Sequence, residues 1–340
     1  MMKQNRVLFI ILLFMSSKAL AVNDRLILTD DPPKRLSEYN FFLNPINQSP
    51  NEQVVPYELI TSLFSDYSEK HRFVYVPDGM TAVYNDDEVF DFPVGTALIK
   101  TFSYQKTDGS ELLLETRLLL HKDDGWDALT YVWDMNEGDA YLALGGKTID
   151  VRNVITPSNS NYIRYRVPNK NQCKECHLKN DAIEPIGPKP RNINKEIVYR
   201  DDLKRNQIDH WTAIKILQEK NYSYDRMVNA FDQNYDLNLR ARSYLDINCG
   251  HCHSPEGSAS SSGLYLSIDD EDFGIYKKPV AAGRGSGGLS YSIVPGYPEE
   301  SILLYRMLSN EPDVMMPESG RTLMHDEAIE LLTEWITEMK

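Results

Sequence analysis

All four cysteines of this 340-residue chain stand in two pairs of identical spacing, and a histidine follows each pair. The residues are Cys173, Cys176 and His177 in the stretch QCKECH, and Cys249, Cys252 and His253 in the stretch NCGHCH. Two thiols at this spacing can form thioether bonds to the vinyl groups of a haem, and the histidine after them can ligate the iron. The two motifs therefore predict two covalently bound haem c groups, with His177 and His253 as axial iron ligands.

Two other chemistries use paired cysteines. Four-cysteine zinc sites usually separate their pairs by far fewer residues than the stretch 177–248 that lies between these pairs, and zinc leaves the two adjacent histidines unexplained. Redox-active pairs of the thioredoxin type stand at the head of a helix in a βαβ unit, and no such unit is predicted in this region. Haem attachment is the favoured interpretation.

A haem iron has a second axial position, and the chain offers a methionine for the haem of the second motif. Met316 precedes Pro317 in the stretch VMMPESG, on a predicted loop before the last helix. Small cytochromes c present a thioether sulfur from a loop of this kind, and His/Met ligation raises the reduction potential relative to two histidines. We expect Met316 to be the sixth ligand, with Met315 as the alternative.

The second axial position of the first haem has no evident ligand, because no Met-Pro pair lies between the two motifs. The candidates are a tyrosine, His71, His121, His210 and Met227. An open position is the remaining alternative, and it would admit peroxide or another small ligand and imply catalysis. His251, inside the second cysteine pair, is expected to be a surface residue.

The N-terminus predicts export. Residues 1–6 are basic, the apolar run 7–15 is too short to span a bilayer, and small residues flank Leu20 before a cleavage site after Ala21. We expect a signal peptide over residues 1–21 and a periplasmic location, the kind of compartment in which haem c is attached. A short membrane anchor is the alternative, and no later stretch is long enough to span a membrane.

The chain is acidic, with a net charge of −14. The predicted signal peptide carries three positive charges, so its removal gives −14 − 3 = −17 for the mature chain. This charge argues against binding to nucleic acid or to anionic membrane surfaces. It suits a redox partner protein with a basic docking patch, or it serves only to keep an exported protein soluble.

The elements that must position the motifs divide the chain into four parts. Residues 22–55 predict an irregular lead-in, and residues 56–168 a β-rich, sandwich-like antiparallel domain with turn signals between short strands. The first haem segment occupies 169–236, and residues 237–340 hold the second motif. Helices are predicted over 212–220, 239–248, 298–308 and 326–339, the last with Asp326 as its N-cap. The expected fold class is α+β, with a mainly helical dihaem region after the β-rich domain.

Two resemblances add to this interpretation. The C-terminal part, from YLDINCGHCHSPEG through VPGYPEESILLYRML to MMPESG and ELLTEWI, resembles the class I cytochrome c fold. From roughly Pro56 to Ile336, the chain resembles a family of exported bacterial dihaem c-type cytochromes. In that family segments like DFPVGTALIKTF, ETRLLL and YVWD precede an NQCKECH-type motif, and PIGPKPRNIN and an NCxHCH-type motif follow. The resemblance implies the same haem-binding cysteines and histidines and Met316 as a ligand, and it implies no substrate.

These observations predict a periplasmic dihaem cytochrome that transfers single electrons. The alternative is a peroxidase-like dihaem oxidoreductase, in which the first haem is an open catalytic site and the His/Met haem receives electrons. A third possibility is a binding module, in which the β-rich domain captures a substrate or partner. No catalytic triad, metalloprotease motif or phosphate-binding loop makes that domain an enzyme by itself.

Overall fold

The structure is a computed structural model that describes residues 20–86, 88–157, 162–219, 225–270, 280 and 283–340. Residues 1–19, which hold most of the predicted signal peptide, lie outside the described residues. Within the described part, no helix combines the length and the apolar character that crossing a membrane requires.

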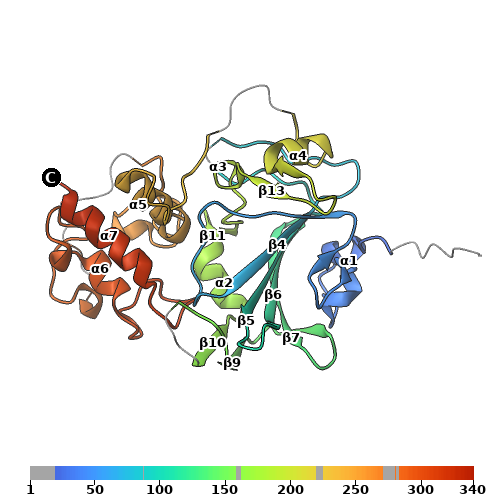
Figure 1. Ribbon diagram of the computed structural model, residues 1–340, viewed down its shortest axis with the longest axis horizontal. Coiled ribbons are helices and arrows are strands. Elements are labelled where there is room, and N and C mark those ends of the chain that lie inside the picture. The colour runs from blue at the N-terminus through green and yellow to red at the C-terminus, as the bar shows by residue number, and fades with distance from the viewer. Residues whose placement is uncertain (1–19, 87, 158–161, 220–224, 271–279, 281–282) are drawn as a thin grey trace, which may run out of the picture.

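A six-stranded antiparallel sheet forms the centre of the N-terminal half, with strands that follow one another along the chain lying side by side (Figure 1). Its strands, in order across the sheet, are β3 (Val54–Pro56), β4 (Glu69–Tyr75), β5 (Ala97–Gln105), β6 (Glu111–Lys122), β7 (Gly125–Asp134) and β8 (Asp139–Leu142). Side chains alternate between the two faces of a strand. Apolar residues at every second position therefore give one face a continuous core, as in the cross-strand row Phe73, Ile99, Leu118 and Leu129.

The N-terminal segment covers this apolar face. It forms α1 (Arg25–Leu28), the 3-10 turn η1 (Leu36–Tyr39) and a ribbon of β1 (Phe42–Asn44) and β2 (Ser49–Pro50). Ile27, Leu36 and Tyr39 are almost fully buried in the core of the sheet, and the rings of Tyr39 and Phe41 stack at 4.9 Å. The expected irregular lead-in over 22–55 thus contains only short elements, and its apolar side chains supply one layer of the fold.

Helices, short ribbons and loops cover the other face of the sheet. The helices are α2 (Lys170–His177), α3 (Pro190–Ile193) and α4 (Gln207–Ala213). The ribbons are β9 (Lys147–Arg152) with β10 (Tyr162–Val167), β11 (Leu178–Lys179) with β12 (Ala182–Ile183), and β13 (Glu196–Val198) with β14 (Lys204–Asn206). The predicted α+β class is confirmed. The sandwich-like expectation was wrong, because in the described part of the chain only small ribbons and helices face the large sheet.

The C-terminal part packs its helices around a separate apolar core, drawn in orange and red in Figure 1. It contains α5 (Leu237–Leu245), the π-helical turn η2 (Asp246–Gly250), α6 (Ile302–Met307), α7 (Asp326–Glu338) and the 3-10 turns η3 (Ser260–Ser262), η4 (Gly283–Ser286) and η5 (Pro298–Glu300). The helices predicted over 239–248, 298–308 and 326–339 are present, the second interrupted at Ser301. Asp326 is the first residue of its helix and His325 is the N-cap, so that capping prediction was wrong.

The helix predicted over 212–220 was also wrong. The helix here is α4, which ends at Ala213, and Lys215 has a positive φ of 66°. The residues after α4 instead form a backbone hydrogen bond with Ala82, whose N–H donates to the carbonyl of Ile216 at 2.9 Å. Leu217 is buried in the same core as Ala82, so tertiary contacts override the helical pattern of this stretch. Lys220 lies outside the described residues.

A hydrogen bond between α5 and α7 gives a first test of this packing. Trp335 is buried, and its Nε1–H donates to Oδ1 of Asn238 at 2.9 Å. We expect Trp335→Phe to lower the free energy of unfolding by about 1–2 kcal/mol, since the donor is lost while most of the buried ring area remains. Urea denaturation measures this difference. Glu334→Ala, on the exposed side of α7, is the matched control and should change stability by less than about 0.5 kcal/mol.

Candidate functional site

The first cysteine pair lies on α2, which packs on the face of the sheet opposite the N-terminal segment. Asn169 caps this helix: its side chain accepts a hydrogen bond from the N–H of Gln172 at 2.9 Å, and the Gln172 side chain accepts one from the N–H of Asn169. Cys173 lies beside Thr130 of β7, and burial raises the pKa of its thiol. The cap and the strand β7 together fix the motif against the sheet.

His177 ends the helix with a defined tautomer. Its Nδ1 lies 2.8 Å from the carbonyl oxygen of Glu184, to which it donates, and its Nε2 makes no hydrogen bond with any residue that the structure describes. Burial lowers the pKa of His177 to about 4, so the ring is neutral at pH 7. A neutral imidazole whose Nδ1–H is held by a carbonyl is the form that ligates a metal through Nε2.

His177 also borders a cavity between α2 and the sheet. About 790 Å³ of this space is free of protein atoms, including solvent at its mouth. The sheet contributes Arg72, Leu98, Ile99, Lys100, Arg117, Leu118 and Leu119, and the other lining residues are Tyr57, Leu59, Leu63, Ile186, Gly187, Lys189, Asn192 and Ile247. The lining is mostly apolar with a few cations, which suits a flat hydrophobic group that carries acidic substituents.

The second cysteine pair follows α5, at the end of the π-helical turn. Cys249 packs against the C-terminal core, and burial raises the pKa of its thiol to about 12. Nδ1 of His253 lies 3.1 Å from the hydroxyl oxygen of Ser262, and the ring is also hydrogen-bonded to the backbone of Leu264. Burial lowers the pKa of His253 to about 4, and the nearby charge of Arg306 acts in the same direction. Both motif histidines are therefore neutral at pH 7 and hydrogen-bonded through Nδ1, His177 to a carbonyl and His253 to a hydroxyl.

The fold brings the two motifs into contact. The sulfurs of Cys176 and Cys252 and a ring nitrogen of His251 all lie within 4.8 Å of one another. The hydrogen bond between the two thiols, followed by burial, raises the pKa of Cys176 to about 12, and the same bond lowers that of Cys252. His251 is half-buried between the motifs, so the expectation of a surface residue was wrong. Although each pair is local in sequence, one cysteine of each reaches the same point in space.

This contact bears on the alternative of zinc. Two thiols and one imidazole are donors that zinc accepts, so the long stretch between the pairs does not by itself exclude a shared metal site. A structural zinc site needs four ligands, however, and Cys173 and Cys249 lie outside this cluster of three. The cluster also leaves His177 and His253 without a role, whereas haem attachment uses both.

Met316 lies on the loop that joins α6 and α7, and its side chain is half-buried. Its N–H donates to the carbonyl of Arg306 at 3.1 Å, and its carbonyl accepts from Nε of Arg321 at 3.1 Å. The Arg321 guanidinium also donates to the carbonyl of Ser309 at 2.7 Å, which closes the loop onto the end of α6. The loop is thus fixed through its backbone, and the role of Met316 as a ligand stays a prediction.

Among the candidate distal ligands for the first haem, a tyrosine, Tyr57, lines the cavity at His177, whereas His71, His121, His210 and Met227 do not. His71 pairs with Glu111 at 2.5 Å, and Met227 is buried in the protein interior. The other two rings contact neighbouring aromatic rings: His121 stacks on Trp126, and His210 lies against Tyr199 at a tilt of 40°. Within the described residues, the cavity therefore offers no histidine or methionine other than His177.

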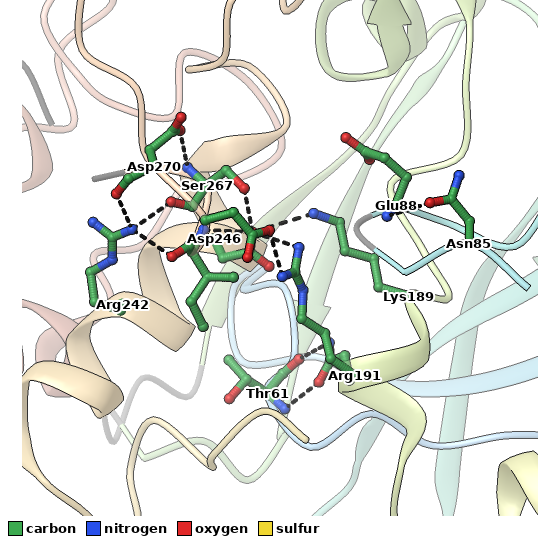
Figure 2. Close-up of polar contacts among 12 residues, drawn as sticks. Thr61, Asn85, Glu88, Lys189, Arg191, Arg242, Asp246, Ser267 and Asp270 are labelled. Atoms are coloured by element: carbon green, nitrogen blue, oxygen red, sulfur yellow. Dashed lines mark hydrogen bonds and ion pairs between the residues drawn. The ribbon is translucent and has the colours of Figure 1, made fainter. Parts of the chain in front are cut away.

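A buried polar junction supports the second motif from the side of the sheet (Figure 2). Asp246 lies just before the motif and accepts hydrogen bonds from Lys189 at 3.3 Å and from the N–H of Ile268 at 3.2 Å. Arg191 reaches the same carboxylate at 4.0 Å and pairs with Asp269 at 2.6 Å. Sequence reasoning treated PIGPKPRNIN only as a family marker. Two cations on either side of Pro190, Lys189 and Arg191, were the available signal that this stretch binds a buried acid.

Searches against models of protein families, against curated proteins and against solved structures found no match.

Proposed function

We propose that the chain is a dihaem c-type cytochrome that carries single electrons. The observation that carries this proposal is the shared state of the two motif histidines: each ring is neutral, and each Nδ1 lies within hydrogen-bonding distance of an oxygen atom. The cavity beside His177 supplies apolar walls for the first haem. A bound haem c supplies an iron that accepts and gives up one electron, and the residues of this chain fasten and orient it.

The contact between the motifs supports electron exchange between the two haems. Cys176 and Cys252 are the second cysteines of their pairs, and their sulfurs lie in one cluster. Attachment at these points therefore brings the cysteine sides of the two groups together. We propose that an acidic surface, reflected in the net charge of −14, receives a redox partner with a basic docking patch, and that the protein acts in the periplasm.

The cysteine pairs test this proposal. We expect Cys173→Ala/Cys176→Ala, expressed with a c-type haem-attachment system, to lose half of the covalent haem, because only one pair of thioether bonds remains. Intact mass and the absorbance of the alkaline pyridine derivative measure the number of haems per chain. The matched variant Cys249→Ala/Cys252→Ala should lose the other half. A wild-type chain that carries no covalent haem, with zinc found by elemental analysis, would contradict the proposal.

One observation favours a second candidate function. The cavity lining contains no histidine or methionine besides His177, and among the candidate second ligands only Tyr57 borders it, so an open iron position is the alternative to a tyrosine ligand. An open iron position would make the protein a peroxidase-like oxidoreductase, with the His/Met haem as the point of electron entry. Electron paramagnetic resonance of the oxidised protein separates the two functions. Two low-spin ferric signals support the electron carrier, and one high-spin signal beside one low-spin signal supports the enzyme.

A further inference from the structure

A row of three cations crosses the sheet beneath the first motif. Arg72 on β4, Lys100 on β5 and Arg117 on β6 are direct cross-strand neighbours, and the row continues to Thr130 on β7. Cross-strand neighbours point to the same face of a sheet. All three cations line the cavity that His177 borders, so they are presented together to whatever fills it.

One buried carboxylate, that of Glu115, pairs with a cation of this row. Arg117 pairs with Glu115 through two hydrogen bonds, at 2.5 Å and 3.0 Å. The same carboxylate accepts a hydrogen bond from the hydroxyl of Tyr165 at 2.6 Å, so its capacity is largely used. Glu115 thus neutralises Arg117 and leaves the other two cations of the row to find partners elsewhere.

Arg72 and Lys100 form no ion pair among the described residues, and only the more distant carboxylates of Glu58 and Glu115 act on them. Arg72 is buried and donates to the backbone carbonyl of Lys70 at 3.3 Å and to the hydroxyl of Ser62 at 3.5 Å. The Lys100 ammonium makes no hydrogen bond or ion pair in the described part of the chain. It lies over the ring of Phe102, 4.9 Å from the ring centre, and keeps some accessible surface because it borders the cavity.

Such an arrangement favours an anion. A charge that leaves water without a partner is costly, and burial correspondingly lowers the pKa of Lys100 well below its ordinary value. Two cations side by side in a partly enclosed site also repel each other. A ligand with negative charge would relieve both effects, and guanidinium and ammonium groups bind carboxylates particularly well.

The direction of the row relates it to the first motif. Cys173 lies beside Thr130, at one end of the row, and Arg72 stands at the other. Neighbouring strands lie about 4.8 Å apart, so three spacings put roughly 14 Å between the two ends. A haem held by thioether bonds at its vinyl groups carries its two carboxylates on the remote side of the ring. The row therefore runs from the attachment point toward the region where those carboxylates would lie.

We propose that Arg72, Lys100 and Arg117 form a carboxylate-binding site that receives the carboxylates of the haem attached at Cys173 and Cys176. The inference rests on the proposed dihaem function and adds three positioning residues to it. These residues fix the orientation of the first haem in its cavity and raise its reduction potential, because positive charge nearby disfavours the oxidised iron.

The test uses the haem-loaded protein and the separate variants Lys100→Met and Arg72→Met. Each keeps the length of an apolar stem and removes an unpaired charge, so folding should be preserved. We expect both haems to stay attached by intact mass, and the reduction potential of one haem to fall while that of the other is unchanged. Resonance Raman bands of the haem carboxylates should shift in the same variants. Lys100→Arg keeps the positive charge and should give the wild-type reduction potential and Raman bands. Lys147→Met, at an exposed position on β9, should alter neither quantity.

Three results would overturn the inference. Unchanged potentials and Raman bands in both variants, with both haems attached, would show that the row does not hold the haem carboxylates and would leave the dihaem function intact. Saturable binding of succinate to the haem-loaded protein, abolished in Lys100→Met, would assign the site to a free carboxylate instead. The absence of covalent haem from the wild-type chain would overturn the proposed function and this inference together.

Discussion

Met316→Ala is expected to leave two haems attached and to convert one of them from low-spin to high-spin iron. Loss of the thioether ligand removes the strong field on that side, and it lowers the reduction potential of that haem. The loop should survive, because Arg306 and Arg321 hold it through backbone atoms that alanine also has. The measurement is electron paramagnetic resonance of the oxidised protein, with a potentiometric titration of the same sample. We expect complete loss of one low-spin signal.

Met315→Ala is the matched control for this experiment. Met315 is the neighbouring thioether, and it is more deeply buried than Met316, with 9% of its surface exposed. Its truncation should lower the free energy of unfolding by about 2 kcal/mol through lost packing and leave the spin state unchanged. The reverse pattern, in which Met315→Ala gives the high-spin signal, would transfer the ligand role to Met315.

The elements that sequence predicts well here are those with a strong local period. The long strands β5, β6 and β7 and the helix α7 follow patterns of two and of about 3.6 residues, and both patterns reflect one buried face. The segment 212–220 has apolar residues at helical spacing, but its partner Ala82 lies far away in sequence. A local pattern carries no information about such a partner, which explains the wrong helix.

In the candidate site, too, local sequence patterns are predictable and contacts between distant segments are not. The cysteine and histidine spacing is local and was visible at once, whereas the approach of Cys176 to Cys252 depends on how two segments pack. The cations Arg72, Lys100 and Arg117 were invisible for a related reason. They lie on three different strands, and only the register of the sheet shows that they form one row. Sequence identifies the reactive groups, and the fold decides which of them face one another.

Asp66→Ala is expected to lower the free energy of unfolding by about 4 kcal/mol, the largest loss among the substitutions considered. The Asp66 carboxylate is buried between the sheet and the C-terminal part. It accepts hydrogen bonds from the N–H of Thr322 at 2.7 Å, from the N–H of Leu323 at 2.8 Å and from the hydroxyl of Thr322 at 2.9 Å. Alanine leaves three donors without an acceptor, and the positive φ of 50° adds strain for a residue other than glycine, asparagine or aspartate.

Asp66→Asn separates the hydrogen bonds from the charge. Burial raises the pKa of Asp66 despite its hydrogen bonds, so the ionised form carries a desolvation penalty that asparagine lacks. A folded-state pKa above the unfolded value means that this carboxyl group lowers stability as pH rises through that range. The asparagine oxygen can accept from both backbone donors, its amide can donate to the Thr322 hydroxyl, and asparagine tolerates positive φ. Urea denaturation at pH 7 should therefore give a change below about 1 kcal/mol for Asp66→Asn.

The same pair of variants tests whether the contact between the sheet and the C-terminal part fixes the Met316 loop. Thr322 and Leu323 follow directly on Arg321, whose side chain holds the Met316 carbonyl. If Asp66 fixes this segment, Asp66→Ala should loosen the Met316 loop and produce a partly high-spin second haem, whereas Asp66→Asn should retain the low-spin signal. A fully low-spin spectrum in Asp66→Ala, at a temperature where the variant is folded, would show that the loop holds its shape without the sheet. Equal stability losses in the two variants would show that the charge, and not the set of accepted hydrogen bonds, is what Asp66 contributes.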